Sequence, residues 1–339
     1  MSQVLVVIEH DRGEVAETAY QAIGFARALV AAGVGSSIAA VLVGADADSL
    51  AAGLGAHGVS NVVQVHHADL SDYAPEAWGD VVAQVAVSLS AVAVVATGTD
   101  RGNEVLAHVA AITDAPFAAN VSEIGAVAGD GALALTRVRW GGSLLEQAVL
   151  TGSILVMSCA AHVFSGDPFS GDPAGGVGPA VGAVEPTFSV FEPSFARAAT
   201  RTRITDRVTL ASGITLTTAA IVVSGGRGVG SADGFAPLEE LAVLLGGAVG
   251  CSRVATNNGW RPHSDQVGQT GKRIAPELYI ACGISGAIQH WVGMMAAKKV
   301  LAINTDSEAN MVGKADYAVM GDLHKILPAV SAEIRRRRA

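Results

Sequence analysis

One stretch of the sequence, residues 278–306, constrains the fold more than any other. It begins with an apolar run, Leu278–Cys282, continues through the small-residue turn Gly283–Gly286 and a Gln-His pair, and ends in a second apolar run that closes on Asn304. Short apolar runs separated by a helix-length segment are typical of parallel strands joined by a crossover helix. The polar residues then fall at the carboxyl edge of a sheet, where α/β proteins bind nucleotides.

The length and composition of the chain agree with an α/β protein. Its 339 residues are enough for two domains with separate cores, and 50% of them are hydrophobic while only 5% are aromatic. Abundant Gly and Ala beside Val-rich runs are typical of helices packed closely on parallel sheets. No apolar run reaches the roughly 20 residues of a transmembrane helix. Because the first residues enter a strand directly, we expect a cytoplasmic protein that is not embedded in a membrane.

Cysteine and charge usage narrow the class of protein further. The three cysteines, Cys159, Cys251 and Cys282, are scattered without metal-ligand spacing, which fits a reducing compartment. Residues 1–208 carry 21 acidic and 9 basic side chains, whereas residues 209–339 carry 10 and 13. The second part therefore suits an anionic ligand better than the first, although four of its basic residues form the terminal run. The acidic chain as a whole argues against general nucleic-acid binding.

The first two-thirds of the chain alternates between strand and helix signals. We predict strands at Val4–Ile8, Ser37–Val43, Asn61–His66 and Ala91–Ala96, and helices at Glu17–Ala31, Glu76–Leu89 and Glu104–Ile112. This alternation predicts a mainly parallel sheet with helical crossovers. After Asn120 the pattern changes to shorter runs that predict an antiparallel edge or excursion: Gly131–Trp140, Ser143–Leu150 and Ser153–Cys159.

A second α/β run follows the Gly- and Pro-rich segment Ser165–Gly182, which predicts a loop. We place the domain boundary near Val208. The predicted strands beyond it are Ala219–Ser224, Ala248–Ser252, Leu278–Cys282, Val300–Asn304 and Tyr317–Met320, with a last helix near Leu323–Arg336. Each run is short and continuously apolar, as expected of strands covered on both faces. We therefore predict two three-layer α/β/α domains with mainly parallel sheets, residues 1–208 and 209–339, the second of them Rossmann-like.

Small, polar and basic residues follow the predicted strands of the second domain. Alone, each group is a weak signal: Gly226-x-Gly228 lacks the third glycine of a dinucleotide fingerprint, and Gly268-x-x-Gly271-Lys272 is two residues short of a P-loop. Glycine also serves simply to make a tight turn between strand and helix. Together at one sheet edge, these loops supply N–H donors, two arginines, hydroxyls and an imidazole. Such a set suits an anionic nucleotide with a planar ring.

Residues 216–330 closely resemble the FAD domain of electron-transfer flavoprotein α subunits. Separated blocks keep both order and spacing, which makes the resemblance specific. The blocks are Val-Ser-Gly-Gly-Arg-Gly (223–228), Ser-Arg (252–253), Gln-Val-Gly-Gln-Thr-Gly-Lys (266–272), Pro-Glu-Leu-Tyr-Ile-Ala (276–281), Gly-Ile-Ser-Gly-Ala-Ile-Gln-His (283–290), Ile-Asn (303–304) and Ala-Asp-Tyr (315–317). Residues 1–208 resemble the family's first domain in layout, with weaker motifs. The chain departs from the family at Thr305, where Lys is common, and at 310–312, where Asn-Met-Val replaces the usual Pro-Ile-Phe.

The resemblance implies a set of FAD-binding residues. Arg227 and Ser252 match binding positions in the first two loops, and Arg253 matches an arginine held over the ring system. The loop along the ribityl chain and the ring edge is matched by Val267, Gly268, Gln269 and Thr270, with the Thr270 hydroxyl near the flavin. The turn that receives the pyrophosphate and places an imidazole near a ring carbonyl is matched by Ser285, Gly286, Ala287, Ile288, Gln289 and His290. The adenosine end is matched by Asn304, Asp322 and Leu323.

The resemblance also implies a function. The chain would be the FAD-carrying α subunit of a heterodimer that passes single electrons and turns over no substrate of its own. It would accept electrons from flavin dehydrogenases, such as the acyl-CoA dehydrogenase class of fatty acid β-oxidation, and deliver them to a membrane quinone oxidoreductase. A smaller β subunit would complete the flavin site and hold AMP. Because carriers of this kind swing the FAD domain between partners, the junction near Val208 is expected to act as a hinge.

Three other interpretations stay open at the level of sequence. A free-standing flavin- or NAD-dependent oxidoreductase would need acid–base residues near the ring, and only His290 is a candidate. A non-redox nucleotide-binding or regulatory protein would be colourless. A bifurcating relative would carry a second FAD in the β subunit.

Other motifs have structural explanations that we prefer. His66-His67 ends a predicted strand with no third ligand nearby, which favours exposed or capping histidines over a metal site. The segment 97–104 follows a strand and opens a helix, and capping of that helix by Asp100 or Asn103 explains it without a ligand. For Trp291, we favour packing over shaping of the site.

Overall fold

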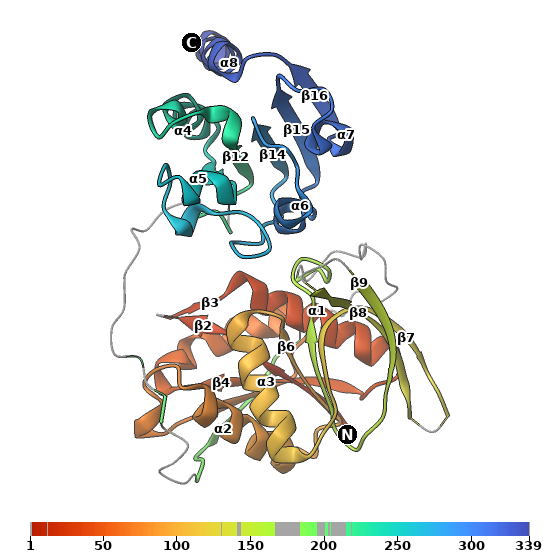
Figure 1. Cartoon of the computed structure of the whole chain (residues 1–339). Helices are drawn as coiled ribbons and strands as arrows, with labels where there is room; N and C mark the ends of the chain where they lie inside the picture. The colour runs from red at the N-terminus through yellow and green to blue at the C-terminus, as the bar shows by residue number, and fades with distance from the viewer. Residues whose placement is uncertain are drawn as a thin grey trace. The chain divides into compact units, whose positions relative to one another are not determined.

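The computed structural model describes residues 2–11, 13–129, 131–140, 144–166, 184–194, 201–202, 204, 215–217 and 219–338. The chain divides into two compact units, residues 1–208 and 209–339, which we call unit 1 and unit 2 and describe separately (Figure 1). Most of the predicted loop 165–182, and the predicted hinge near Val208, lie outside the described residues.

Unit 1 is built on a nine-stranded sheet with the strand order β11-β5-β4-β1-β6-β10-β7-β8-β9. Its strands are β1 (Gln3–Val7), β4 (Ser37–Val43), β5 (Asn61–Val65), β6 (Ala93–Thr97), β7 (Phe117–Val127), β8 (Leu133–Arg139), β9 (Leu144–Leu150), β10 (Leu155–Cys159) and β11 (Thr187–Phe191). A short antiparallel pair, β2 (His10–Asp11) and β3 (Glu14–Val15), follows β1. Its helical segments are α1 (Glu17–Ala31), η1 (Ala45–His57), η2 (Ala68–Leu70), α2 (Pro75–Ser88) and α3 (Asp100–Thr113).

Helices cover both faces of this sheet because successive strand residues point apolar side chains to opposite sides. Val4 and Val6 of β1 belong to a core with α1 and η1, whereas Leu5 and Val7 belong to a core with α2 and α3. The neighbouring strands β1 and β6 therefore lead into helices on opposite faces, α1 and α3. Such a point, where the direction of the connections changes, leaves a crevice at the carboxyl edge.

The structure corrects part of the prediction for unit 1. The antiparallel excursion is confirmed for β8 and β9, but it is wrong for Ser153–Cys159, which forms the interior strand β10, parallel to both β6 and β7. All five residues of β10 are buried, as is typical of a central parallel strand. The prediction also missed β7 and missed β11, which pairs in parallel with β5 at the far edge.

Unit 2 contains a five-stranded, fully parallel sheet with the order β13-β12-β14-β15-β16. Its strands are β12 (Ile221–Gly225), β13 (Ala248–Cys251), β14 (Leu278–Cys282), β15 (Lys299–Asn304) and β16 (Tyr317–Met320), so the predicted strands are confirmed with ends that move by at most two residues. Its helical segments are η5 (Arg227–Val229), η6 (Asp233–Phe235), α4 (Ala236–Leu245), α5 (Arg253–Asn257), η7 (His263–Asp265), α6 (Ile288–Met294), α7 (Asn310–Lys314) and α8 (Leu323–Arg338).

The sheet of unit 2 is also covered on both faces, which confirms the three-layer prediction. Val223 and Ile280 pack with α4 and α8, whereas Val222 and Tyr279 pack with α6 and α7. The adjacent strands β12 and β14 thus lead into helices on opposite faces, an arrangement in which α/β sheets generally bind ligands at the carboxyl ends of the strands. Among the described residues, no helix combines the length and apolar character that a membrane span requires.

Candidate functional site

The loops at the carboxyl edge of unit 2 are joined by backbone hydrogen bonds. The Gly226 N–H donates to the Cys282 carbonyl at 2.9 Å, and the Gly228 N–H donates to the Gly283 carbonyl at 3.0 Å. The Ser252 N–H donates in turn to the Gly225 carbonyl at 2.9 Å. The turns that follow β12, β13 and β14 therefore form one continuous rim.

Glycine is required where these loops approach one another. A Cβ on Gly226 would lie 2.4 Å from the Gly283 carbonyl oxygen, and a Cβ on Gly286 would lie 2.3 Å from the Met311 nitrogen. Gly286 also has a φ of +78°, which side chains other than glycine rarely adopt. The rim is consequently made of backbone, with its N–H groups close to the sheet edge.

The segment 266–272 closes on itself around a buried glutamine. Gln266 is 1% exposed; its Nε2 donates to Thr270 Oγ1 at 2.9 Å, and its Oε1 accepts from Thr256 Oγ1 at 2.8 Å. The Gln269 N–H donates to the Gln289 carbonyl at 2.7 Å, which ties the segment to the first turn of α6. As a result, Gln269 and Thr270 are exposed at the tip of a braced loop, while Val267 and Gly268 are buried.

His290 is buried beneath this loop. Its Nε2 lies 2.8 Å from the hydroxyl of Tyr279, a fully buried residue of β14. Burial lowers the pKa of His290 to about 4, with the Val267 carbonyl opposing the shift, and burial raises the pKa of Tyr279. Both groups are therefore neutral at pH 7, so the imidazole acts through hydrogen bonding and not through charge.

Two buried polar atoms near this edge make no hydrogen bond of ordinary geometry among the described residues: Ser252 Oγ, and His290 Nδ1, whose nearest backbone acceptor is the Val267 carbonyl. Unsatisfied buried polar atoms are rare in native proteins and call for an explanation such as a ligand. Arg227 and Arg253 are exposed on the segments that follow β12 and β13, and no ion pair between described residues uses either guanidinium. Positive charge, open donors and a backbone-lined rim fit a nucleotide cofactor such as FAD.

The remaining predicted site residues lie at the same edge with mixed exposure. Ser285, Ala287, Ile288 and Gln289 are exposed on the turn into α6. Asn304 Nδ2 donates to the Ile284 carbonyl at 3.1 Å, and the Asp322 carboxylate accepts from the His324 N–H at the start of α8 at 2.9 Å. Leu323 is 4% exposed and belongs to the core. The side chains of Asn304, Asp322 and Leu323 thus have structural partners, and their contact with adenosine stays a prediction.

Sequence reasoning missed two polar residues behind this rim, Gln266 and Tyr279. Each lies inside a motif that the resemblance used, but nothing in the spacing indicates that its side chain points inward. The available signal was a polar side chain within an otherwise apolar or glycine-rich run, as in Leu278-Tyr-Ile-Ala281.

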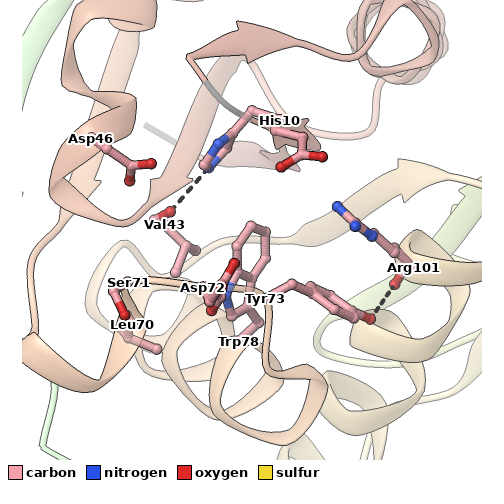
Figure 2. Close-up of a pocket in the computed structure, with 10 residues that line it drawn as sticks. His10, Val43, Asp46, Leu70, Ser71, Asp72, Tyr73, Trp78 and Arg101 are labelled. Carbon is pink, nitrogen blue, oxygen red and sulfur yellow. Dashed lines mark hydrogen bonds between the residues drawn. The ribbon is translucent and has the colours of Figure 1, made fainter. Parts of the chain in front are cut away.

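Unit 1 has its own hollow near the carboxyl ends of β1 and β4, with a volume of about 180 Å³ (Figure 2). His10 Nε2 lies 2.9 Å from the Val43 carbonyl oxygen, and its ring lies 5.5 Å from the ring of Trp78. The Arg101 guanidinium lies 4.9 Å from the centre of the Tyr73 ring. The lining also carries three aspartates, Asp11, Asp46 and Asp72. Its aromatic and basic groups are engaged with one another and its acidic lining disfavours phosphate.

The turn after β6 is closed by the chain itself. Thr99, and not Asp100 or Asn103, caps α3: its Oγ1 accepts from the Gly102 N–H at 2.9 Å. The same hydroxyl donates to Glu9 Oε2 at 2.6 Å. Asn103 instead accepts from Ser158 Oγ at 2.6 Å. The prediction of a helix cap is confirmed, but the capping residue is Thr99 and not Asp100 or Asn103.

The His66-His67 pair also has structural partners. His67 Nδ1 accepts from the Asp69 N–H at 3.1 Å and caps η2, which confirms a capping role, and His66 Nε2 lies 2.9 Å from an Asp48 carboxylate oxygen. Within the described part of the chain, no three His, Cys, Asp or Glu side chains are grouped to hold a metal ion.

Comparison with known proteins finds two family domains in the chain. Residues 4–188 match the electron transfer flavoprotein domain, and residues 215–295 match the electron transfer flavoprotein FAD-binding domain. The chain is 36% identical to the electron transfer flavoprotein subunit alpha of Mycobacterium leprae and 37% identical to that of Mycobacterium tuberculosis, with 100% of each chain covered. It is 32% identical to the probable mitochondrial electron transfer flavoprotein subunit alpha of Caenorhabditis elegans, over 98% of this chain and 94% of that protein.

Proposed function

This chain belongs to the electron transfer flavoprotein family as an α subunit, and from that premise we propose that unit 2 holds one FAD and that the protein carries single electrons between other flavoproteins and a membrane quinone oxidoreductase. The proposed donors are flavin dehydrogenases of the acyl-CoA dehydrogenase class, as in fatty acid β-oxidation. We propose a cytoplasmic location for this exchange.

One observation carries the proposal for FAD. The carboxyl edge of unit 2 combines a glycine rim, two exposed arginines and two buried polar atoms, Ser252 Oγ and His290 Nδ1, that make no hydrogen bond of ordinary geometry among the described residues. A dinucleotide with a hydrogen-bonding ring would supply those partners and the negative charge. Bound FAD supplies reversible one-electron chemistry.

The residues of this chain have separate proposed roles. Arg227, Ser252 and the turn 285–289 would hold the cofactor around its phosphates, while Thr270 and His290 would bond the ring. Asn304, Asp322 and Leu323 would lie at the adenosine end. Arg253 would supply positive charge near the ring. At ~4 Å and an effective dielectric constant of about 20, one charge is worth roughly 4 kcal/mol, and screening at an exposed site reduces this considerably. Because His290 is neutral at pH 7, Arg253 is the stronger candidate for tuning the potential.

We propose that a β subunit completes the site and, as the resemblance implies, holds AMP. The edge strand β16 supports an additional packing partner, because all four of its residues are exposed, Tyr317 by 61% and Met320 by 48%. An uncovered edge strand with apolar side chains is a ready pairing surface. This edge is therefore the part of unit 2 that we propose to lie against the β subunit.

Co-expression with the β subunit tests the proposed function. The purified heterodimer should be yellow, with one FAD per α chain by absorbance after denaturation. A reduced acyl-CoA dehydrogenase should then bleach the bound flavin, and a quinone oxidoreductase should restore it. A colourless heterodimer that takes up no added FAD overturns the proposal. A yellow heterodimer that no dehydrogenase reduces limits it to flavin binding.

A further inference from the structure

The buried amide of Gln266 bridges two hydroxyl groups. Its Nε2 faces Thr270 Oγ1 at 2.9 Å and its Oε1 faces Thr256 Oγ1 at 2.8 Å. Thr256 Oγ1 also lies 3.0 Å from the Arg253 carbonyl oxygen in the first turn of α5. Gln266 is 1% exposed, whereas Thr270 is exposed, so only Thr270 can meet a ligand at this place.

The backbone holds this amide in place. The Lys272 N–H donates to the Gln266 carbonyl at 2.6 Å, and the Val267 N–H donates to the Cys251 carbonyl at 2.9 Å. A Cβ on Gly271 would lie 2.2 Å from the Gln266 carbonyl oxygen, so glycine is needed for the loop to close here. The side chain of Gln266 therefore has a fixed position, and only the direction of its amide is free to differ.

Two directions of the amide give the Gln266 nitrogen, the Gln266 oxygen and both hydroxyl groups at least one hydrogen bond each. In the first, Nε2 donates to Thr270, whose hydrogen then points away from Gln266. In the second, Nε2 donates a hydrogen bond to the Thr256 hydroxyl, and that hydroxyl donates its own to the Arg253 carbonyl. The Thr270 hydroxyl then donates to Oε1. The two directions differ in what Thr270 offers to a ligand: a hydrogen in the first and a lone pair in the second.

We infer that Gln266 is a positioning residue that sets the hydrogen-bond direction of the Thr270 hydroxyl toward the bound flavin. The inference rests on the proposed function and adds to it a residue that does not touch the cofactor. The edge of a flavin ring presents an acceptor nitrogen when oxidised and an N–H when reduced. Because the Gln266 amide can hold either direction, the Thr270 hydroxyl can donate to the oxidised ring and accept from the reduced ring. A group that can only donate could bond only the oxidised ring.

Double-mutant cycles in the co-expressed heterodimer test this role. We would strip the flavin and titrate oxidised FAD into the wild type, Thr270→Val, Gln266→Met and the double variant. Each single change should weaken FAD binding about three- to tenfold, the range expected for one neutral hydrogen bond. The double variant should bind FAD within about twofold of Thr270→Val alone, because Gln266 acts through the hydroxyl that is already absent.

The matched control is Thr270→Ser, which keeps the hydroxyl; in that background Gln266→Met should still weaken binding. If Gln266→Met weakens FAD binding by the same factor with and without the Thr270 hydroxyl, its role is structural and the inference is overturned. No effect in the wild-type background overturns it equally. Circular dichroism of the flavin-free complex shows whether Gln266→Met folds. If it does not, Thr256→Val takes its place in the cycle, because it removes the hydrogen bond between Thr256 Oγ1 and Gln266 Oε1.

The flavin-free protein gives an independent readout. The side-chain amide resonances of Gln266, assigned by nuclear magnetic resonance, should shift in Thr270→Val before any FAD is added, since the acceptor of Nε2 is removed. Unchanged resonances overturn the network. A wild-type heterodimer that binds no FAD instead overturns the proposed function, which distinguishes the two failures.

Discussion

The carboxyl edges of the two sheets share a topology but differ in chemistry. In unit 1 the adjacent strands β1 and β6 lead into helices on opposite faces, and in unit 2 the strands β12 and β14 do the same. In unit 1, Glu9 accepts from Thr99 at 2.6 Å at the start of α3, so an acidic side chain of the protein occupies this helix start. In unit 2, backbone and unpartnered polar atoms line the edge of the described structure.

This difference separates what topology provides from what side chains decide. A change in the direction of the connections creates a crevice in any doubly wound sheet. Whether the crevice accepts an anion depends on the residues that follow the strands. Unit 1 fills these positions with Glu9 and aspartates, and unit 2 fills them with glycines and arginines. The same topology therefore presents an acidic edge in unit 1 and a glycine-rich edge with two arginines in unit 2.

The largest effect is expected from adding a methyl group to a glycine at the carboxyl edge of each sheet. Gly226→Ala would place a Cβ 2.4 Å from the Gly283 carbonyl oxygen, so the rim must move and FAD affinity should fall at least tenfold. The matched change in unit 1 is Gly98→Ala, whose Cβ would lie 2.3 Å from Asn120 Oδ1. It should lower the stability of unit 1 by about 1–3 kcal/mol with FAD binding unchanged. Equal losses of FAD in both variants, measured by titration, contradict the comparison.

The next effect is the pH dependence of unit 2. Because burial lowers the pKa of His290 to about 4, the unfolded chain takes up the proton first as pH falls below about 6.5. Stability should be complete above that pH and should decrease by roughly 3 kcal/mol as pH approaches 4. His290→Gln should remove this dependence in the flavin-free protein. Burial also lowers the pKa of His10, so unit 1 should change with the same sign. Urea titrations with hydrogen exchange resolved by peptide report the two units separately.

A third prediction compares the arginines of the two edges. Arg253→Ala should make the midpoint potential of bound FAD more negative, on the order of 50 mV, because the reduced flavin loses a positive neighbour. Arg101→Ala in unit 1 should leave the potential unchanged and weaken only the contact with Tyr73, by about 0.5–1 kcal/mol. Potentiometric titration of both variants decides this; an identical potential in Arg253→Ala and the wild type removes Arg253 from the tuning of the flavin.

The smallest effect concerns the closed edge of unit 1. Thr99→Val removes the cap on the Gly102 N–H and the hydrogen bond to Glu9, which should cost about 1 kcal/mol of unfolding free energy. FAD content and potential should not change. A loss of flavin from this variant, with unit 1 still folded, would show that the edge of unit 1 contributes to the cofactor site.

The elements that could be predicted from the sequence are those whose buried residues form a continuous apolar run. The strands of unit 2 were found because apolar runs such as Leu278–Cys282 are buried on both faces. Strand β7 was missed because Ser122 and Glu123 interrupt its apolar residues and its burial is mixed. The place of β10 inside the sheet depends on its neighbours β6 and β7, which are distant in sequence, and no local pattern specifies them.

The candidate site was predictable only in its backbone. Glycine spacing and strand ends located the loops that the structure joins into one rim. The supporting hydrogen bonds were not predictable, because Gln266 finds Thr256 and Thr270 only after the loop closes, and Tyr279 meets His290 across a strand and a helix. The helix cap was assigned to the wrong residue for a similar reason. Thr99, Asp100 and Asn103 can all cap a helix, and Thr99 does so because α3 begins at Asp100, a boundary that the sequence does not specify to one residue.

The bare edge of unit 2 has a consequence for how the protein must be made. Every residue of β16 is exposed, and a strand in this state can add a strand from any chain that offers one, including another copy of itself. On the proposed heterodimer, the rates at which the two subunits are synthesised must therefore stay matched. An excess of this chain is expected to deposit as insoluble material, and its recovery in soluble form should rise with the dose of the companion gene.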